Sequence, residues 1–540
     1  MNSTLTHIAS RLKSGAIIPQ SLPLPGTNQT ENSAGGFSFS VDDWTRLQRF
    51  LILGSEGGSY YASEQKLSAD NANGVLSCIQ NDGPRVVREI VAISKAGRAP
   101  KTDPALFALA LCASLGDDAT RRLALDALPE VARTGTHLFH FAAFCDGARG
   151  WGRGLRGAIG RWYEGMDAQK LSYQAIKYQS RDGWSHRDLL RLAHPKSKSE
   201  AHGIIYNWMT QGWPGVGDEP HDVEAVQQIW AFERAKRAQS EAEIVSLIRD
   251  YQLPREAIPT QFLTSPLVWE ALLDEMPLAA MIRNLATMTK IGLLTRTSNA
   301  TKTITARLGD GERIRKSRLH PIALLSALTT YSSGKGVKGS ATWNAVPKIT
   351  DALDSAFYLA FGSVETTGKR FVLALDVSGS MGFSTIAGVA GLTPRVASSA
   401  MAMVTNAVED DVQTLAFSHS LETMNLSRKQ RLDDVLNAVD KISMGATDCA
   451  LPMLWASKTK AQADVFVIYT DSETWFGKIH PVEALRRYRE ETGIAAKLIV
   501  VGMVANHFSI ADPNDAGMLD VVGFDTAAPQ LMSDFSLGNM

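Results

Sequence analysis

Apolar residues recur at three- and four-residue spacing through most of the chain from Val41 to Ala356, with short polar, Gly or Pro breaks between the runs. This spacing places the apolar positions on one face of a helix. A long succession of helices without strands indicates paired helices stacked as a solenoid, although the letters show no sharp repeat. Examples of these helical segments are Asp103–Ser114, Ala119–Ala132, His186–Ala193, Ser240–Tyr251, Pro266–Leu285 and Pro321–Tyr331. Helix starts are marked by caps such as Thr102-Asp103-Pro104 and Thr264-Ser265-Pro266.

The pattern changes after about Thr366, where short, continuously apolar runs begin to alternate with helical stretches. That alternation predicts a mostly parallel sheet covered by helices on both sides. The strand-like runs are Phe371–Leu375, Val412–Phe417, Val465–Tyr469, Lys497–Val504 and Leu519–Gly523, and the helices lie near Arg395–Val408, Arg431–Lys441 and Pro481–Glu491. A chain of 540 residues is too long for one core. We therefore predict a helical domain over residues 36–365 and an α/β domain over residues 366–540.

The first 35 residues are rich in Pro, Ser, Thr and Asn, which predicts a loosely ordered arm over residues 1–35. The N-terminus lacks the basic-then-apolar layout of a secretion signal, and no apolar run approaches the ~20 residues of a membrane span. The four cysteines are widely spaced and read as reduced thiols. These features predict a cytoplasmic protein with no membrane contact.

One stretch carries the most chemical information. The apolar run Phe371–Leu375 ends in Asp376, and Ser378 and Ser380 follow it at alternate positions. In open α/β sheets, ligands bind at the carboxyl ends of the strands. Carboxylate and hydroxyl oxygens suit a hard divalent cation such as Mg²⁺. Alone, Asp-x-Ser-x-Ser is equally typical of a capped turn.

Two later stretches strengthen the metal interpretation. Thr447 lies in a Gly- and Ala-containing loop, and Asp471 ends a second apolar run, Val465–Thr470. Together with the first loop they resemble the metal-ion-dependent adhesion site of von Willebrand factor A domains. The resemblance implies one cation, held by Asp376, Ser378, Ser380, Thr447 and Asp471, with an open position that an acidic protein ligand can fill.

The charge is unevenly distributed along the chain. From Phe371 onward there are 12 Lys and Arg against 20 Asp and Glu, a net charge of −8, so the preceding residues carry +7 of the total of −1. Eleven basic residues lie between Arg149 and Lys198, opposed by four acids. Because Lys and Arg supply most phosphate contacts, this segment is a candidate RNA surface. A solvated helix face is the alternative, and His186 is equally interpretable as a capping or packing residue.

The helical region resembles the Ro (TROVE-domain) autoantigens, a family of ribonucleoproteins with bacterial members. The resemblance covers nearly the whole chain beyond residue 35. The segments that carry it are Leu47–Tyr61, Gly183–His194, Met276–Leu285, Thr470–Trp475 and Ile510–Pro513.

The resemblance implies a ring of HEAT-like helical repeats closed by a von Willebrand A domain. It also implies binding of small noncoding Y RNAs on the outer surface and passage of single-stranded RNA ends through the ring. A Y RNA links bacterial relatives to polynucleotide phosphorylase, a 3′-to-5′ exoribonuclease. The family's RNA contacts fall at positions matching Lys177, Arg181 and His194, and the neighbouring His186, Arg187 and Arg191 are further candidates.

Two other functions compete with RNA binding. A carboxylate-based hydrolase is disfavoured because two-metal chemistry needs more carboxylates than this hydroxyl-rich set provides, and no triad signature, P-loop or CxxC is present. We therefore expect no catalysis. A protein-binding helical scaffold that uses its metal site for adhesion is the main alternative. The second basic stretch, from Arg313 to Lys338, either lines the ring or is merely exposed.

Overall fold

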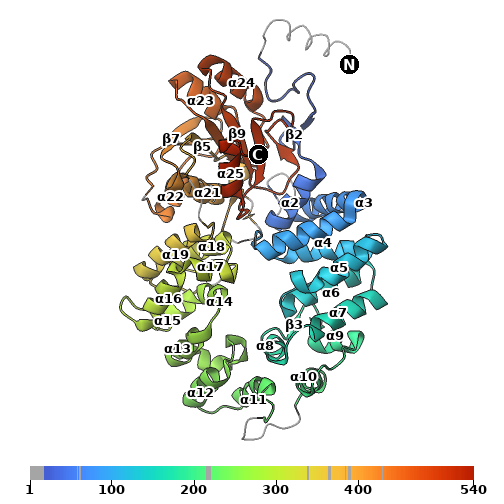
Figure 1. The fold of residues 1–540 in the computed structure, drawn as a ribbon. Helices are drawn as coiled ribbons and strands as arrows, with labels where there is room; N and C mark the ends of the chain where they lie inside the picture. Colours follow the sequence, from blue (N-terminus) through green and yellow to red (C-terminus); the bar gives the residue numbers. More distant parts are fainter. Residues whose placement is uncertain are drawn as a thin grey trace.

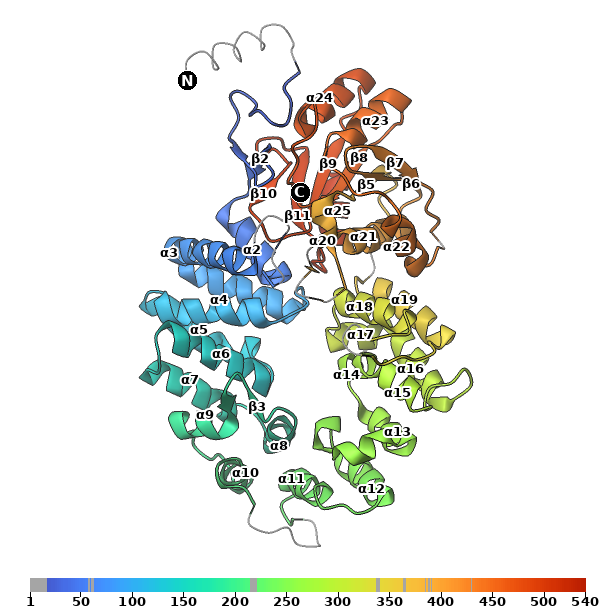
Figure 2. The same ribbon diagram turned by 180° about the vertical axis from the view of Figure 1, so that it is seen from behind.

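The computed structural model describes residues 17–56, 59, 63–213, 221–336, 340–362, 366–383, 385–386, 389, 391–428 and 430–540. Figure 1 shows a helical arc whose first and last helices both meet an α/β domain, so that the chain closes into a ring. The view from behind, in Figure 2, shows the same closure, with α10 and α11 at the end of the ring opposite the α/β domain.

Consecutive helices of the arc lie side by side, as the helical spacing of apolar residues predicts (Figure 1). The first half of the arc consists of α2 (Asp43–Leu53), α3 (Glu64–Ala96), α4 (Asp103–Leu115), α5 (Asp118–Val131), α6 (Gly135–Ala148), α7 (Arg153–Glu164), α8 (Ala168–Lys177), α9 (His186–Ala193) and α10 (Glu200–Gln211). The second half consists of α11 (Glu224–Ala235), α12 (Glu241–Tyr251), η1 (Arg255–Ala257), η2 (Thr260–Thr264), α13 (Pro266–Glu275), α14 (Leu278–Arg283), α15 (Leu285–Lys290), α16 (Asn299–Gly309), α17 (Gly311–Ser317), α18 (Pro321–Ser332) and α19 (Pro347–Leu359). A short hairpin of β3 (Ser180–Arg181) and β4 (Trp184–Ser185) precedes α9.

The helix ends follow the local chemistry with two corrections. The side chain of Ser265 accepts a hydrogen bond from the Val268 amide at the start of α13, as its capping position predicts. At the start of α4, by contrast, Thr102 makes no side-chain capping bond. The predicted helix Pro266–Leu285 is not continuous, because Pro277 cannot donate a backbone hydrogen bond and α13 ends at Glu275.

The C-terminal domain is a six-stranded sheet in the order β11-β9-β8-β5-β6-β7. Five of its strands are parallel, and β7 is antiparallel at one edge. The strands are β5 (Arg370–Asp376), β6 (Asp411–Phe417), β7 (Leu421–Met424), β8 (Val465–Thr470), β9 (Lys497–Gly502) and β11 (Met518–Val522). The helices are α20 (Gly379–Phe383), α21 (Pro394–Val408), α22 (Leu432–Asp440), α23 (Leu451–Thr459), α24 (Pro481–Thr492) and α25 (Ala528–Leu537). The five predicted strands are all present, whereas β7 and α23 had no clear sequence signal.

The N-terminal segment differs from the prediction of a loose arm. Residues 1–16 lie outside the described residues, but residues 17–35 lie against the α/β domain. There β1 (Gln29–Glu31) and β2 (Phe37–Ser40) form a small sheet with β10 (Phe508–Ser509). The Gln20 side chain is fully buried and donates hydrogen bonds of 2.8 Å to Asp448 Oδ1 and to the Ile479 carbonyl. Low local hydrophobicity did not prevent order, because the partners of this segment come from the other end of the chain.

Both ends of the helical arc are fastened to the α/β domain. At one end, Arg98 Nε donates to Asp525 at 2.9 Å, and the Arg98 carbonyl lies 3.0 Å from Nε2 of His320, which caps α18. At the other end, the Leu432 amide at the start of α22 donates to Asp354 of α19 at 3.0 Å. These contacts hold the first and last helices in fixed positions beside the sheet.

Candidate metal centre and nucleic-acid interface

The candidate metal site lies where β5 and β8 end, side by side in the sheet. Asp376 is the last residue of β5, and one of its carboxylate oxygens accepts a hydrogen bond from the Ser378 amide at 2.9 Å. The other oxygen accepts a bond from the Thr470 hydroxyl at 2.6 Å, which ties the two strand ends together. The hydroxyls of Ser378 and Ser380 are 3.1 Å apart. The Asp-x-Ser-x-Ser segment therefore folds so that its oxygens converge.

The two aspartates of the site repel each other. Burial and the charge of Asp471 raise the pKa of Asp376 to about 7. The pKa of Asp471 is also raised by burial, although a hydrogen bond from Ser380 opposes this shift. Burial and the Asp471 charge likewise raise the pKa of Glu473 to about 8. Three buried acids close together are unfavourable unless protons or a cation neutralise them.

Thr447 lies in a loop that is hydrogen-bonded to both of the loops that carry the other proposed ligands, the one after β5 and the one after β8. Its carbonyl accepts hydrogen bonds from the amides of Trp475 and Phe476 at 3.2 and 3.1 Å. Two residues earlier, the Gly445 carbonyl accepts from the Gly379 amide at 3.1 Å. The structure therefore brings the three predicted loops together and keeps all five predicted ligand residues buried.

The donor set fits a hard cation. The interactions that shift the pKa values of Asp376 and Asp471 include no positive charge, so within the described chain their repulsion is not offset by a base. The described residues also contain no group of three or more His, Cys, Asp and Glu arranged to hold a metal. A cation here would depend on hydroxyls and water as well as the two carboxylates, which suits Mg²⁺ because it keeps several waters. When bound, such an ion would neutralise the buried carboxylates and offer an open coordination position.

Several residues that support the loops of the candidate metal site were not predicted from the sequence. Asn506 donates to the Asp471 carbonyl at 2.8 Å and lies 3.3 Å from Glu473. Asn32 donates to the Thr474 carbonyl at 2.8 Å, and Ser38 donates to the Ser472 carbonyl at 2.8 Å. Thr470 directly precedes Asp471 and was visible as a hydroxyl at a strand end, but the other contacts have no local signal.

The basic segment 149–198 spans α7 to α9 and is mostly exposed. Ten of its eleven Lys and Arg side chains are exposed, including Arg181 of β3. Arg187 and Arg191 are four residues apart on α9 and so share a face. His194, exposed, ends the helix in a left-handed conformation with φ of 46°. Arg181, Arg187, Arg191 and His194 are therefore accessible to a ligand.

His186 is a packing residue, which corrects its assignment as an RNA contact. Its Nδ1 lies 2.8 Å from the Tyr163 hydroxyl, and its ring packs edge-on against Phe139 at 4.8 Å. Burial lowers the pKa of His186 to about 4, so the ring is neutral. His186 is the first residue of α9, directly after Ser185 of the Ser185–Asp188 capping box, and its side chain is buried.

Lys177 lies apart from the exposed basic residues. It is half-buried, and its ammonium donates to the Tyr173 hydroxyl at 2.9 Å. It lines a cavity of about 430 Å³ together with Arg249, Arg255 and residues of α13 and α14. Figure 1 shows α8 on the inner side of the ring, facing the second half of the arc. Lys177 therefore lines a cavity shared by α8, α12, α13 and α14 and lies apart from the exposed basic surface.

The second basic stretch, from Arg313 to Lys338, contains both exposed and buried residues. Arg313, Arg315, Lys316 and Arg318 of the α17 region are exposed, whereas His320 is buried against the Arg98 carbonyl. Lys338 lies outside the described residues. No helix among the residues described is long and apolar enough to cross a membrane.

The fold defines a class of protein in which a helical arc is closed into a ring by an α/β domain that carries a candidate metal site. The TROVE domain model matches residues 30–330, and the Ro60 vWA domain model matches residues 370–536. The chain is 43% identical over 514 residues to the RNA-binding protein RO60 of Deinococcus radiodurans, covering 95% of this chain and 96% of that protein. It is 40% identical over 597 residues to the RNA-binding protein RO60 of Caenorhabditis elegans, covering 97% and 92% respectively.

A solved structure agrees with these relatives. The crystal structure of the Deinococcus radiodurans Ro (RSR) protein matches with a TM-score of 0.69 and 42% sequence identity, over 92% of this chain and 100% of that one. The chain belongs to the Ro family.

Proposed function

We propose that this chain binds small noncoding RNA of the Y type on the outer surface of the helical ring and acts in RNA quality control. Structured or misfolded RNAs would send a single-stranded end into the ring. A 3′-to-5′ exoribonuclease of the polynucleotide phosphorylase type, linked through the bound Y RNA, would degrade them. The chain itself would bind RNA rather than cleave it.

The exposed basic face of α9 supports this proposal most directly. Arg187, Arg191 and His194 offer two guanidinium groups and an imidazole on one accessible surface, and Arg181 is exposed on the hairpin that precedes this helix. Guanidinium groups bind phosphates in bidentate geometry and stack on bases. Both relatives compared above carry the name RNA-binding protein RO60.

The test is RNA binding by a variant with Arg187→Ala and Arg191→Ala. We expect weaker binding of structured noncoding RNA, and a salt dependence reduced by ~0.7–0.9 in log–log slope for each lost phosphate contact. The matched control is Lys441→Ala with Lys458→Ala, which removes two exposed charges from the acidic domain. Equal affinity and slope in the two variants would refute the assignment of this face.

We also propose a second function, protein binding at the candidate metal site. There a carboxylate from a protein partner would complete the coordination of an Mg²⁺ ion held by Asp376, Ser378, Ser380, Thr447 and Asp471. Phe383, Trp475 and Phe476, which are 72%, 39% and 51% exposed, are the only Phe or Trp side chains classed as exposed in the described chain. Phe383 ends α20, which carries Ser380, and the other two follow Asp471 in the next loop. Exposed aromatic residues are enriched at protein interfaces.

The partner would therefore present an acidic residue flanked by apolar side chains. The test compares the proteins that three baits capture from cell extract in the presence of Mg²⁺. The baits are the wild type, the Asp376→Asn variant, and the double variant Phe383→Ser with Phe476→Ser. A partner that all three capture equally well does not use this edge. A matched control is Leu267→Ser, an exposed apolar side chain on α13.

A further inference from the structure

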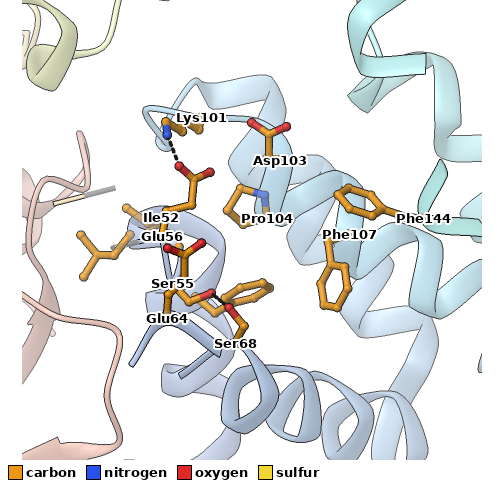
Figure 3. A pocket seen from close by; sticks show the side chains of 13 residues that line it. Ile52, Ser55, Glu56, Glu64, Ser68, Lys101, Asp103, Pro104, Phe107 and Phe144 are labelled. Carbon is orange, nitrogen blue, oxygen red and sulfur yellow. Dashed lines mark hydrogen bonds and ion pairs between the residues drawn. The ribbon is translucent and has the colours of Figure 1, made fainter. Parts of the chain in front are cut away.

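A pocket of about 310 Å³ lies between α2, α3, α4 and α6, outside the candidate sites described above. Figure 3 shows Phe107 and Phe144 on one side of it and the carboxylates of Glu56, Glu64 and Asp103 around it. Its volume is at the lower end of the roughly 300–1,000 Å³ found for small-molecule sites. The pocket is large enough for one planar ring system but not for a protein segment.

The walls of the pocket are built by fixed aromatic contacts. The rings of Phe50 and Phe107 are 6.0 Å apart and those of Phe107 and Phe144 are 5.5 Å apart, both edge to face. Phe50 is buried, whereas Phe107 and Phe144 are half-buried and so keep part of their surface open. Gly54 turns with φ of 66°, and a Cβ there would stand 3.3 Å from Pro104 of the pocket wall. The pocket is therefore preformed for a flat aromatic ligand.

Lys101 connects this pocket to a second one. Its ammonium forms an ion pair with Glu56 at the pocket mouth (Figure 3). The same lysine lines a neighbouring cavity of about 530 Å³ with Arg283 of α14 and Trp343. Arg283 is exposed, and the described residues contain no carboxylate that pairs with it. On its other side, α14 borders the cavity that contains Lys177. Cations thus continue along the ring from the pocket of Figure 3 to Lys177.

The aromatic walls, the carboxylates and the adjoining cations together limit the chemical class of ligand that this pocket can bind. Lys101 and Arg283 can bind phosphate groups, and the phenylalanine rings can stack on a nucleobase. Carboxylates accept hydrogen bonds but cannot donate them at neutral pH, so they favour a base edge that presents N–H groups. Cytosine, adenine and guanine each carry an exocyclic amino group, whereas uracil carries a carbonyl oxygen at the position of the cytosine amino group and keeps only its ring N3–H as a donor on this edge.

We propose that the pocket of Figure 3 binds a nucleobase with an exocyclic amino group from the single-stranded part of the bound RNA, with Lys101 contacting the adjoining phosphate. This inference rests on the proposed RNA-binding function and adds base selectivity to it. Uracil would place its O4 carbonyl oxygen against a carboxylate where cytosine places its amino group, and a site built to receive that amino donor discriminates against a ligand that lacks it.

The experiment measures the affinity of the full chain for eight-nucleotide oligocytidylate and oligouridylate, which differ at the amino position of the base. We expect oligocytidylate to bind at least tenfold more tightly. Glu56→Gln with Asp103→Asn should reduce the ratio below about threefold, because amides both donate and accept. The matched control, Asp126→Asn with Glu130→Gln on α5, changes two carboxylates that also pair with basic residues, Arg161 and Lys95, and should leave the ratio unchanged.

Photo-crosslinking gives a second measurement that does not depend on the variants. A crosslink from a photoreactive cytidine analogue in the oligonucleotide should map to residues 50–56 or 101–107. Equal affinity for the two oligonucleotides, or an unchanged ratio in the pocket variant, overturns the inference even if structured RNA still binds with the expected salt slope. Competition by free cytidine monophosphate as strong as that by the oligonucleotide would overturn the single-strand assignment. Failure of the wild-type chain to bind any RNA would instead overturn the proposed function.

Discussion

Arg49 of α2 and Asp520 of β11 form a two-pronged ion pair, in which Nη2 of the fully buried arginine lies 2.7 Å from each carboxylate oxygen. Nη1 of the same arginine donates to the carbonyls of Asn506 and Phe508 at 3.1 and 2.9 Å. Asn506 in turn donates to the Asp471 carbonyl. One side chain of the helical domain is therefore linked, through Asn506, to the loop that carries the candidate metal ligand Asp471.

Arg49→Met should destabilise the protein strongly, because it keeps the length of the side chain but leaves Asp520 without its partner. Breaking a buried pair costs about 3–5 kcal/mol. Chemical denaturation followed by circular dichroism measures the loss. Arg428→Met, which breaks an exposed pair with Asp410, should cost no more than about 1 kcal/mol. Similar losses in the two variants would show that the Arg49 pair does not stabilise the domain junction.

The sheet and its metal edge were predictable because their signals are local. A continuous apolar run that ends in an acid marks a buried strand and its ligand-bearing end, and Asp376 and Asp471 both lie where that rule puts them. Gln20, Asn32 and Arg49 were not predictable as supports of this edge. Their partners are more than 400 residues away, so neither periodicity nor composition contains them.

The basic segment shows a different limit of sequence reasoning. Charge counting identified the region correctly as exposed, but it cannot tell which of its residues line a cavity instead. Lys177 and Arg181 are four residues apart, yet Lys177 ends α8 and lines a cavity, whereas Arg181 follows on an exposed hairpin. Helix α8 ends between them, with Tyr178 as its C-cap, so the helical spacing that places residues four apart on one face does not extend to Arg181.

Low pH should destabilise the protein through its buried histidines. Burial lowers the pKa values of His137, His186 and His320 to about 4, against about 6.5 for an unfolded chain. Between these values the unfolded chain binds more protons at these three sites, so the histidines' contribution to stability is complete above about pH 6.5 and falls as the pH drops toward 4. The raised pKa values of Asp376 and Glu473 act in the opposite direction. Each histidine contributes at most about 1.4 kcal/mol per pH unit.

The free energy of unfolding, measured by denaturation at half-unit pH steps, tests this expectation. His320→Gln should reduce the slope below pH 6.5 by the share of one histidine, whatever its effect on the absolute stability. A slope identical to that of wild type would mean that burial does not hold His320 neutral.

Lys177 and Arg181 should affect different RNA ligands. Arg181→Ala should weaken binding of a structured stem, because its side chain is exposed on the hairpin that precedes α9, and should lower the salt slope by ~0.7–0.9. Lys177→Ala should leave stem binding nearly unchanged and weaken binding of a single strand. Filter binding with a blunt stem-loop and with a single-stranded oligonucleotide measures both. If both variants lose stem binding equally, Lys177 does not act apart from the exposed basic surface.

His194 offers a milder test of the same surface. His194→Ser should reduce stem affinity by ~0.5–1.5 kcal/mol, the net value of one hydrogen bond, with little change in melting temperature because the side chain is exposed. Isothermal titration calorimetry and a melting curve on the same sample separate the two effects. A fall in melting temperature with unchanged affinity would reveal a structural role instead.

Asp376→Asn should separate the metal site from the RNA surface. The substitution removes one of the mutually repelling buried carboxylates, so we expect the metal-free variant to melt at or above the wild-type temperature. It also removes a proposed Mg²⁺ ligand, so the stabilisation of wild type by Mg²⁺, which grows as RT ln(1 + [Mg²⁺]/Kd), should be lost. RNA affinity should stay within about threefold, because a tenfold change requires about 1.4 kcal/mol of coupling between the domains. A thermal-shift titration with Mg²⁺ beside an RNA-binding isotherm tests both, with Asp434→Asn, an exposed carboxylate on α22 of the same domain, as the control. A variant that responds to Mg²⁺ as wild type does would refute the five-residue site, and a folded variant that loses RNA binding tenfold would refute the separation of the two sites.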